Sequence, residues 1–411
     1  MKIISSKARE ILNSRGMPTV EAILETAKGR FTASVPSGVS TSDYEAVEIP
    51  AQKAVKNIAE VEPLLKERDF FSQKEFDCFL IKQDGTKNKS LLGGNAILAL
   101  SIAFCRALAM EQGKELFEHI AALAEEEGSS LLPAGRSNAL SSLFKMPRPC
   151  VLLFEGGKHG NGGLSFQEIL LVPQGSSFQE MFDKAKAVFE GLKSQLNYPF
   201  GVEGGLAAPL GEEEILKLIT RQTSEQIGID AAASSFFSQG KYNLGGKEIS
   251  AGDFLNFYQK LAESYNISFI EDPFDQNNIV NWQNLKLKIK NSIKIKNSKL
   301  KIIGDDLTAT NPQRIKYAQK NNLCDGVIIK PNQIGTVWET IKAVQLAKKF
   351  GWKIIVSHRA GETEDSFIAD LAVGIGADFI KAGGLSQSAR LAKYNRLLEI
   401  EKQLLKSDFN S

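Results

Sequence analysis

The sequence lacks the features that mark nucleic-acid binders, membrane proteins and secreted proteins. Its 50 basic and 48 acidic side chains give a formal net charge of only +2, which argues against nucleic-acid binding driven by bulk electrostatics. No apolar run approaches the roughly 20 residues needed to span a bilayer, and the first residues lack the apolar core of a signal peptide. We therefore expect a cytoplasmic protein without nucleic-acid or membrane partners.

Cysteine is also scarce. The four cysteines have neither the CxxC spacing of a zinc site nor the density of a disulfide framework. We interpret them as reduced thiols of the core: Cys78, Cys105, Cys150 and Cys324.

The 411 residues predict one large domain and one smaller one. Two β-prone runs, 19–26 and 30–35, are separated by a short glycine-containing turn and predict a hairpin. A helix is expected over residues 91–112, ending before Gly113. Residues 128–149 contain Gly, Ser and Pro clusters without a sustained period, so we predict a small α+β domain over 1–135.

The second domain, 136–411, shows a different pattern. Short apolar runs alternate with amphipathic helical stretches such as 251–264, 336–349 and 387–405. This alternation over more than 200 residues predicts a parallel sheet, and its length favours a closed TIM-like (β/α)8 barrel over an open sheet. The strands are expected at residues 267–270, 301–303, 327–329, 353–356 and 377–380.

One low-complexity stretch stands apart. Residues 285–302 read LKLKIKNSIKIKNSKLKI, which could be a basic patch for an anionic partner. A solvated helix–loop–strand connection explains the same composition, and we favour it because no other feature calls for a patch.

Ionisable residues follow the apolar runs in regular succession. In a (β/α) barrel the carboxyl ends of the strands assemble the active site. A single acid after a strand is more often a turn or a helix cap, but here six runs end in such residues: Asp230, Glu271-Asp272, Asp305-Asp306, Lys330, His358-Arg359 and Lys381.

The order of these residues suggests a metal beside cations. Three acidic strand ends form an oxygen cage of the kind that Mg²⁺ prefers. Successive strand residues face opposite ways, so we expect one of Glu271 and Asp272, and one of Asp305 and Asp306, to face the metal. The lysines that follow suggest an anionic substrate whose carboxylate becomes an enediolate.

At this point the chain resembles the enolase family, whose superfamily is known to combine a Lys or His base with one or two Mg²⁺ ions. The resemblance runs from about residue 8 to residue 402 and is carried by these segments, in family order: ILNSRGMPTVE, VPSGVST, GGNAILALS, GGKHGN, SFQE, FIEDPF, GDDLTATNP, IKPNQIGT, VSHRAGETEDSFIADLAVG and RLAKYNRLLEIE. It implies a TIM-like barrel of the enolase type behind a smaller N-terminal domain. It also implies reversible dehydration of 2-phospho-D-glycerate to phosphoenolpyruvate in glycolysis and gluconeogenesis.

The resemblance also implies the metal ligands, with two Mg²⁺ ions in each active site. Asp230, Glu271 and Asp305 would bind the first ion. Ser40, in the loop 37–41, would bind the second when this loop closes and excludes water.

The resemblance assigns the proton transfers to two residues. Lys330 would remove the C2 proton as a neutral amine, with its pKa depressed by Mg²⁺ and by Lys381. Glu203 would protonate the departing C3 hydroxyl. The other substrate contacts are expected from His159, Gln167, Glu168, His358, Arg359 and Lys381. Among them, Glu168 would be a proton-sharing partner of Glu203, and Arg359 would grip the phosphate. His119 is read as an ordinary helix residue.

Several positions depart from the family pattern. Ala360 stands where a phosphate-binding Ser is expected, and Val202 stands where Asp is expected. Glu155 replaces an Asn and adds negative charge near an anionic substrate, unless it faces away or pairs with Lys158. About a dozen residues of the usual loop after Glu48 are missing.

Three functions remain open on the sequence alone. The first is active enolase, acting on a small phosphorylated carboxylate. The second is a related Mg²⁺-dependent lyase or racemase with another substrate, suggested by Ala360 and Glu155. The third is a noncatalytic, enolase-like scaffold or surface-binding protein, although neither catalytic residue nor any metal ligand is lost. The resemblance further suggests a homodimer or an octamer, with Arg9, Arg15 and Glu21 near the pairing region. The sequence is silent on secondary display at the cell surface.

Overall fold

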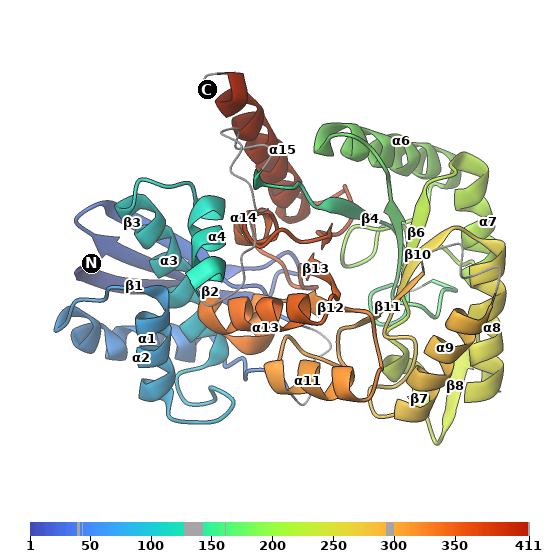
Figure 1. Ribbon diagram of the computed structural model, residues 1–411, viewed down its shortest axis with the longest axis horizontal. Helices are drawn as coiled ribbons and strands as arrows, with labels where there is room; N and C mark the ends of the chain where they lie inside the picture. Colours follow the sequence, from blue (N-terminus) through green and yellow to red (C-terminus); the bar gives the residue numbers. More distant parts are fainter. Residues whose placement is uncertain (39–41, 43, 127–142, 161, 293–299, 410–411) are drawn as a thin grey trace.

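The computed structural model describes residues 1–38, 42, 44–126, 143–160, 162–292 and 300–409. It has a small N-terminal domain beside a closed barrel (Figure 1). The predicted boundary near residue 135 and Ser40 of the predicted lid both lie outside the described residues.

The N-terminal domain is a three-stranded antiparallel sheet with four helices. The predicted hairpin is formed by β2 (Pro18–Thr26) and β3 (Gly29–Ser34). The sequence did not reveal β1 (Ile3–Leu12), because most of its side chains are exposed or half-buried and its apolar alternation is weak. The helices are α1 (Ala51–Lys66), α2 (Gln73–Asp84), α3 (Gly94–Glu111) and α4 (Leu116–Glu126).

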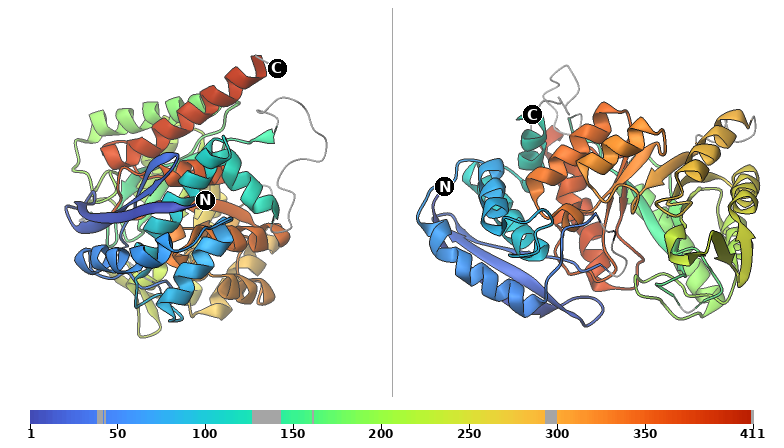
Figure 2. Two further views of the ribbon diagram at one scale, coloured as in Figure 1. Left: turned by 90° about the vertical axis from the view of Figure 1, so that its left-hand side faces the viewer. Right: turned by 90° about the horizontal axis from the view of Figure 1, so that it is seen from below.

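Helix α3 is the buried centre of this domain. By length and composition alone it could cross a membrane, but 83% of it is buried inside the protein. It packs against β2 and β3, as a core helix does. The helices α2, α3 and α4 also contact the barrel helices α12 (Pro331–Ile334), α13 (Val337–Lys349) and α14 (Phe367–Gly374), and Figure 2 shows the two domains side by side.

The barrel closes with eight strands, in agreement with the predicted fold class. Its strands are β4 (Arg148–Glu155), β5 (Glu168–Val172), β6 (Gln226–Asp230), β10 (Ile267–Glu271), β11 (Lys301–Gly304), β12 (Gly326–Ile329), β13 (Lys353–Ser357) and β14 (Phe379–Lys381).

The expectation of an all-parallel sheet is wrong at one strand. Strand β5 runs antiparallel to both β4 and β6, because a loop rather than a helix joins β4 to β5. The first residue of β5 therefore lies at the same mouth as the last residues of the other strands. Neither β4 nor β5 was among the strands predicted from the sequence.

Helices cover the outside of the barrel. They are α6 (Phe178–Leu196), α7 (Glu212–Gln222), α8 (Ala251–Ser264), α9 (Ile279–Asn291), α11 (Pro312–Lys320), α13, α14 and α15 (Ser388–Phe409). Ser177 caps α6 and Thr336 caps α13, and each side chain accepts a backbone N–H from three residues further on. A small sheet, β7 (Phe237–Ser238), β8 (Lys241–Leu244) and β9 (Lys247–Ser250), precedes α8.

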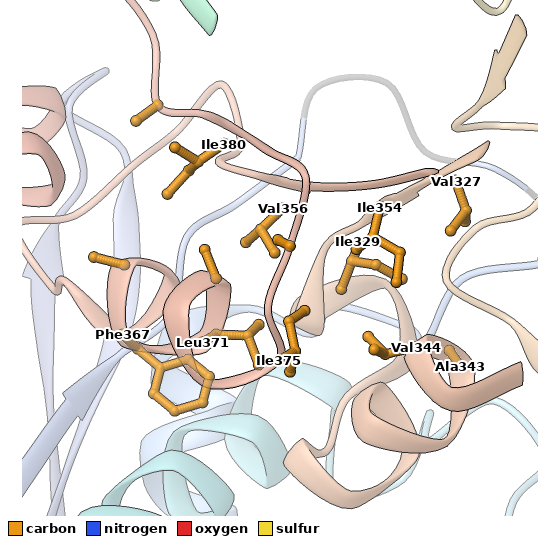
Figure 3. Close-up of a cluster of buried hydrophobic side chains, with 14 of the residues drawn as sticks. Val327, Ile329, Ala343, Val344, Ile354, Val356, Phe367, Leu371, Ile375 and Ile380 are labelled. Atoms are coloured by element: carbon orange, nitrogen blue, oxygen red, sulfur yellow. The ribbon is translucent and has the colours of Figure 1, made fainter. Parts of the chain in front are cut away.

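Each barrel strand is buried on both faces. One face fills the interior of the barrel with residues such as Leu152, Phe269 and Ile328. The other face packs on the helices, as Figure 3 shows for Ile329 and Val356 of β12 and β13. Double burial explains why these strands read as continuous apolar runs. Three of the four cysteines are buried in the core as expected, but Cys78 is exposed.

The low-complexity run is partly described. Its first part forms the end of α9, and its last residues begin β11. Residues 293–299 lie outside the described part of the chain.

Candidate active site

A polar cavity lies at the mouth of the barrel, where the carboxyl ends of the parallel strands meet. The following residues line it: His159, Gln167, Glu168, Glu203, Asp230, Ala232, Asp272, Asp305, Asp306, Lys330, Ser357, His358, Arg359, Ala360 and Lys381. Ten of the twelve predicted site residues are among them. Of the other two, Glu271 contacts Lys381 directly, and Ser40 is not described.

Lys381, the last residue of β14, holds three carboxylates together. Its Nζ lies 2.7 Å from Glu271, 2.9 Å from Glu168 and 3.0 Å from Asp230. All four side chains are buried. Burial lowers the pKa of Lys381, but the three acids outweigh it and raise this pKa well above its ordinary value. One cation shared by three acids leaves an excess of buried negative charge.

Lys330 follows β12 and forms an ion pair with Asp305. The other oxygen of Asp305 accepts a 2.9 Å hydrogen bond from Gln333. Burial lowers the pKa of Lys330, but Asp305 raises it, and the net pKa is about 12. Lys381 lowers this pKa as predicted, but the carboxylate of Asp305 outweighs it. The predicted depression by Mg²⁺ stays a prediction.

Asp272 organises the end of β11. Its carboxylate accepts the backbone N–H groups of Asp305, at 2.9 Å, and of Asp306, at 2.7 Å. To do so it takes a left-handed backbone conformation with φ of 40°, which is uncommon for a non-glycine residue. Asp272, Asp305 and Asp306 all line the cavity. Strand β10 ends at Glu271 and β11 ends at Gly304, so strand alternation does not extend to Asp272, Asp305 and Asp306. Which acid of each pair faces a metal stays a prediction.

The predicted metal ligands suit a hard divalent cation. Asp230 and Glu271 are register partners on adjacent strands, and Asp305 follows the next strand. The Oε1 atom of Glu271 is buried without a hydrogen-bond partner among the described residues, which is costly unless a cation is bound. The acids Asp272, Asp305 and Asp306 form a tighter group, but both oxygens of Asp272 already accept backbone N–H groups. We therefore prefer the predicted set of ligands.

Glu203 faces two histidines and a second glutamate. Its oxygens lie 3.5 Å from Nδ1 of His159 and 3.4 Å from Nε2 of His358. Burial lowers the pKa of His159 to about 4 and holds that of His358 well below its ordinary value, so both rings are neutral at pH 7. Burial raises the pKa of Glu168 to about 7, with Lys381 opposing and Glu203 adding to the shift. Glu168 can therefore take up or release a proton near neutral pH beside Glu203.

Comparison with known proteins identifies the family of the chain. The chain matches the family model "Enolase, N-terminal domain" over residues 3–120 and "Enolase, C-terminal TIM barrel domain" over residues 143–409. It is 39% identical to Enolase B of Dictyostelium discoideum, in an alignment that covers 99% of this chain and 96% of that protein. The chain belongs to the enolase family. It is accordingly a phosphopyruvate hydratase, catalysing the glycolytic dehydration, and the acids at its barrel mouth could hold the metal that enolases use.

Glu155, a departure from the enolase pattern, does not line the cavity. Its carboxylate accepts the backbone N–H groups of Glu203, at 2.8 Å, and of Gly205, at 2.7 Å. Burial and the charge of Glu203 raise its pKa to about 8, although the two N–H groups oppose the shift. The alternative that Glu155 faces away therefore holds, and the described residues show no ion pair with Lys158.

The part of the cavity around Arg359 joins the two domains. Arg359 donates hydrogen bonds to Glu45, at 2.9 Å, and to Asn332, at 3.0 Å. The backbones of Ser37 and Gly361 pair in both directions, at 2.8 and 3.0 Å, so the start of the predicted lid loop is tied to the barrel. Ala360, the other notable departure from the enolase pattern, lies in the wall of the cavity beside Arg359.

Arg390 is a supporting residue that sequence reasoning missed. It is fully buried on α15 and donates to the carbonyl oxygens of Arg359, at 2.6 Å, and Ala360, at 2.7 Å. It also contacts Nδ1 of His358. The segment RLAKYN that contains it was quoted for the resemblance, but its spacing from His358 gave no sign of contact.

Proposed function

We propose that Lys330 removes the C2 proton of 2-phospho-D-glycerate and that Glu203 donates a proton to the departing C3 hydroxyl, with two Mg²⁺ ions bound. The observation that carries this proposal is that Lys330 and Glu203 lie in the same cavity but have different neighbours. Lys330 has an acid as its nearest charged partner, whereas Glu203 lies beside two neutral histidines and beside Glu168, whose pKa is raised to about 7.

Lys330 is suited to be the base by its position. It follows a buried strand, its nitrogen contacts the metal ligand Asp305, and its side chain lines the cavity. Asp230, Glu271 and Asp305 would hold the first Mg²⁺, which would stabilise the charge developing on the substrate carboxylate and offset the charge of Asp305 that keeps Lys330 protonated. We assign the second Mg²⁺ to Ser40 from the family resemblance.

Glu203 is suited to be the acid by its neighbours. A general acid needs a proton close to neutral pH. Glu168 has a pKa of about 7 and lies against Glu203, so the two can share one proton. His159 and His358, both neutral, can orient the Glu203 carboxyl without removing its proton.

The other cavity residues would position the substrate. Arg359 would bind the phosphate through its guanidinium fork, exchanging contacts now made with Glu45 and Asn332. Lys381 would lie beside the substrate carboxylate, and Gln167 and His159 line the same cavity.

The homodimer, or octamer, and the cytoplasmic location remain predictions from the family. The exposed apolar side chains of Leu12 and Met17, at the β1–β2 turn, are consistent with a subunit contact in this region.

The test of this mechanism is the appearance of phosphoenolpyruvate from 2-phosphoglycerate, followed by its ultraviolet absorbance. We expect turnover that requires Mg²⁺, stops with a chelator and falls at least about 10³-fold in Lys330→Ala, since loss of a general base costs about 10²–10⁴-fold. Lys349→Ala, an exposed lysine at the end of α13, is the matched control and should keep full activity. Absence of turnover in the unmodified protein at millimolar substrate would favour the scaffold or the altered-substrate alternative.

A further inference from the structure

The carboxyl group of Glu155 lies behind the active site, in contact with the loop that carries Glu203. Glu155 is the last residue of β4 and is 0% exposed. One of its oxygens accepts the N–H of Glu203 itself, and the other accepts the N–H of Gly205. Both hydrogen bonds are shorter than 3 Å, and neither partner is near Glu155 in sequence.

The loop is built around this carboxyl group. A Cβ atom on Gly201 would lie 2.3 Å from the Glu155 carboxyl carbon, so a side chain at position 201 would collide with it. The backbone of Glu155 also donates to Leu206, at 3.1 Å, and Leu206 donates to Leu153, at 2.8 Å. The loop 201–206 is therefore joined to the end of β4 through both backbone and side chain.

Both oxygens of residue 155 are needed for this arrangement. A carboxyl group, whether ionised or protonated, retains acceptor capacity on each oxygen. An amide has one acceptor oxygen, and its NH₂ group would face a backbone N–H without bonding to it. An amide side chain of the same shape would therefore release either Glu203 or Gly205.

We propose that Glu155 is a positioning residue that fixes the backbone of Glu203 and thereby aims the general acid at the substrate. The proposal rests on the proposed role of Glu203 and deepens it. Glu155 holds the backbone N–H of Glu203. The carboxyl group of the same residue lies beside His159 and His358. If the backbone of Glu203 is released, its carboxyl group shifts away from the substrate. A misplacement of about 1 Å can lower the rate about 10²-fold.

The experiment separates the two proton transfers. Glu155→Gln keeps the side-chain shape and removes one acceptor, whereas Glu155→Asp keeps both acceptors on a shorter chain. The dehydration rate is measured beside the exchange of the C2 hydrogen of 2-phosphoglycerate with solvent deuterium, which requires Lys330 but not the departure of hydroxide. The Mg²⁺ dependence and the KM are measured in parallel.

We expect Glu155→Gln to lower kcat for dehydration by about ten- to hundredfold. The C2 exchange rate, the KM and the Mg²⁺ dependence should stay close to those of the unmodified protein. Glu155→Asp should recover part of the lost kcat. Glu203→Gln, the benchmark, should lose dehydration more completely and likewise keep C2 exchange.

Two results would overturn the proposal. In one, Glu155→Gln lowers dehydration and C2 exchange in equal proportion, which would show a role in folding alone. In the other, it changes neither rate. If Glu203→Gln keeps normal dehydration, the proposed role of Glu203 fails, whatever Glu155→Gln does.

A second variant covers the case in which Glu155→Gln does not fold. Gly201→Ala would displace the Glu155 carboxyl from its place without altering its chemistry, and melting curves would confirm that this variant is folded. It should show the same selective loss of dehydration. Proportional loss of both rates, or no loss, would count against the proposal in the same way.

Discussion

The two walls of the cavity handle negative charge in different ways. On the first, which we call the lysine wall, the acids Asp230, Glu271 and Asp305 are ion-paired with Lys330 or Lys381. On the second, the acid wall, Glu168 lies against Glu203 and Glu203 lies beside two neutral histidines. Behind this wall, and counted with it, Glu155 accepts two backbone N–H groups. The lysine wall is thus arranged around cations, whereas on the acid wall burial raises the pKa values of Glu155 and Glu168.

The lysine wall is itself unevenly neutralised. Burial raises the pKa of Asp305, but the ion pair with Lys330 outweighs it, and the net pKa is lowered. Asp230 and Glu271 share Lys381 with Glu168, and burial raises the pKa of each. The deficit of positive charge therefore lies where the proposed first Mg²⁺ would bind.

The largest effect is expected from removing the shared cation in Lys381→Met. Three buried carboxylates would then lose their common partner, and loss of one member of a buried ion pair costs about 3–5 kcal/mol. We expect the free energy of unfolding, measured with urea in a chelator, to fall by about this amount, and activity to disappear. Added Mg²⁺ should restore part of the stability.

The control for this variant is Lys349→Met, at an exposed position. It should unfold at the same urea concentration as the unmodified protein. If Lys381→Met were as stable as the unmodified protein in chelator, the three acids would not need this lysine for stability. The contrast between the two walls would then be contradicted.

The lysine wall was predictable because its residues come at the ends of apolar runs. In a barrel, the ends of parallel strands meet in space, so Asp230, Glu271, Asp305, Lys330 and Lys381 could be assigned to one mouth before any geometry was known. The closed barrel followed from the same alternation. The pKa of Lys330 could not be predicted, since it depends on which carboxylate its nitrogen contacts.

The acid wall was predictable only through family resemblance. Strand β5 is antiparallel, so Glu168 reaches the mouth from the beginning of a strand rather than from its end. Glu155 acts on backbone N–H groups about 50 residues away in the chain, and Arg390 acts on carbonyl groups about 30 residues away. Contacts from side chains to distant backbone leave no periodic pattern in the sequence.

The acid wall should make the free energy of unfolding depend on pH. Burial raises the folded-state pKa of Glu155 to about 8 and that of Glu168 to about 7, above the ordinary glutamate value of 4.5. Below pH 4.5 both groups are protonated in both states. As the pH rises toward 8, the unfolded chain releases these protons first, so the folded state loses relative stability, by a few kcal/mol at most. Above pH 8 this loss should level off.

Glu155→Gln tests this prediction, because glutamine does not titrate. The lost hydrogen bond shifts its unfolding curve at every pH, so the slope of stability against pH is the quantity to compare. Urea unfolding in chelator between pH 5 and 8 should give a shallower slope for the variant. Parallel slopes would mean that Glu155 is ionised in the folded protein. The contrast between the lysine wall and the acid wall would then fail at this residue.

The smallest effect is expected at Ala360, which belongs to neither the lysine wall nor the acid wall. Its methyl group lies in the cavity wall beside Arg359, where a hydroxyl could donate to the substrate phosphate. One neutral hydrogen bond contributes about 0.5–1.5 kcal/mol, so Ala360→Ser should lower the KM for 2-phosphoglycerate by about two- to tenfold and leave kcat unchanged. Ala369→Ser, at a buried site on α14 outside the cavity, serves as the comparison and should not lower KM. A change in kcat, or in the Mg²⁺ requirement, would show that position 360 acts on the lysine wall, and substrate binding at the phosphate end would then be coupled to the metal site.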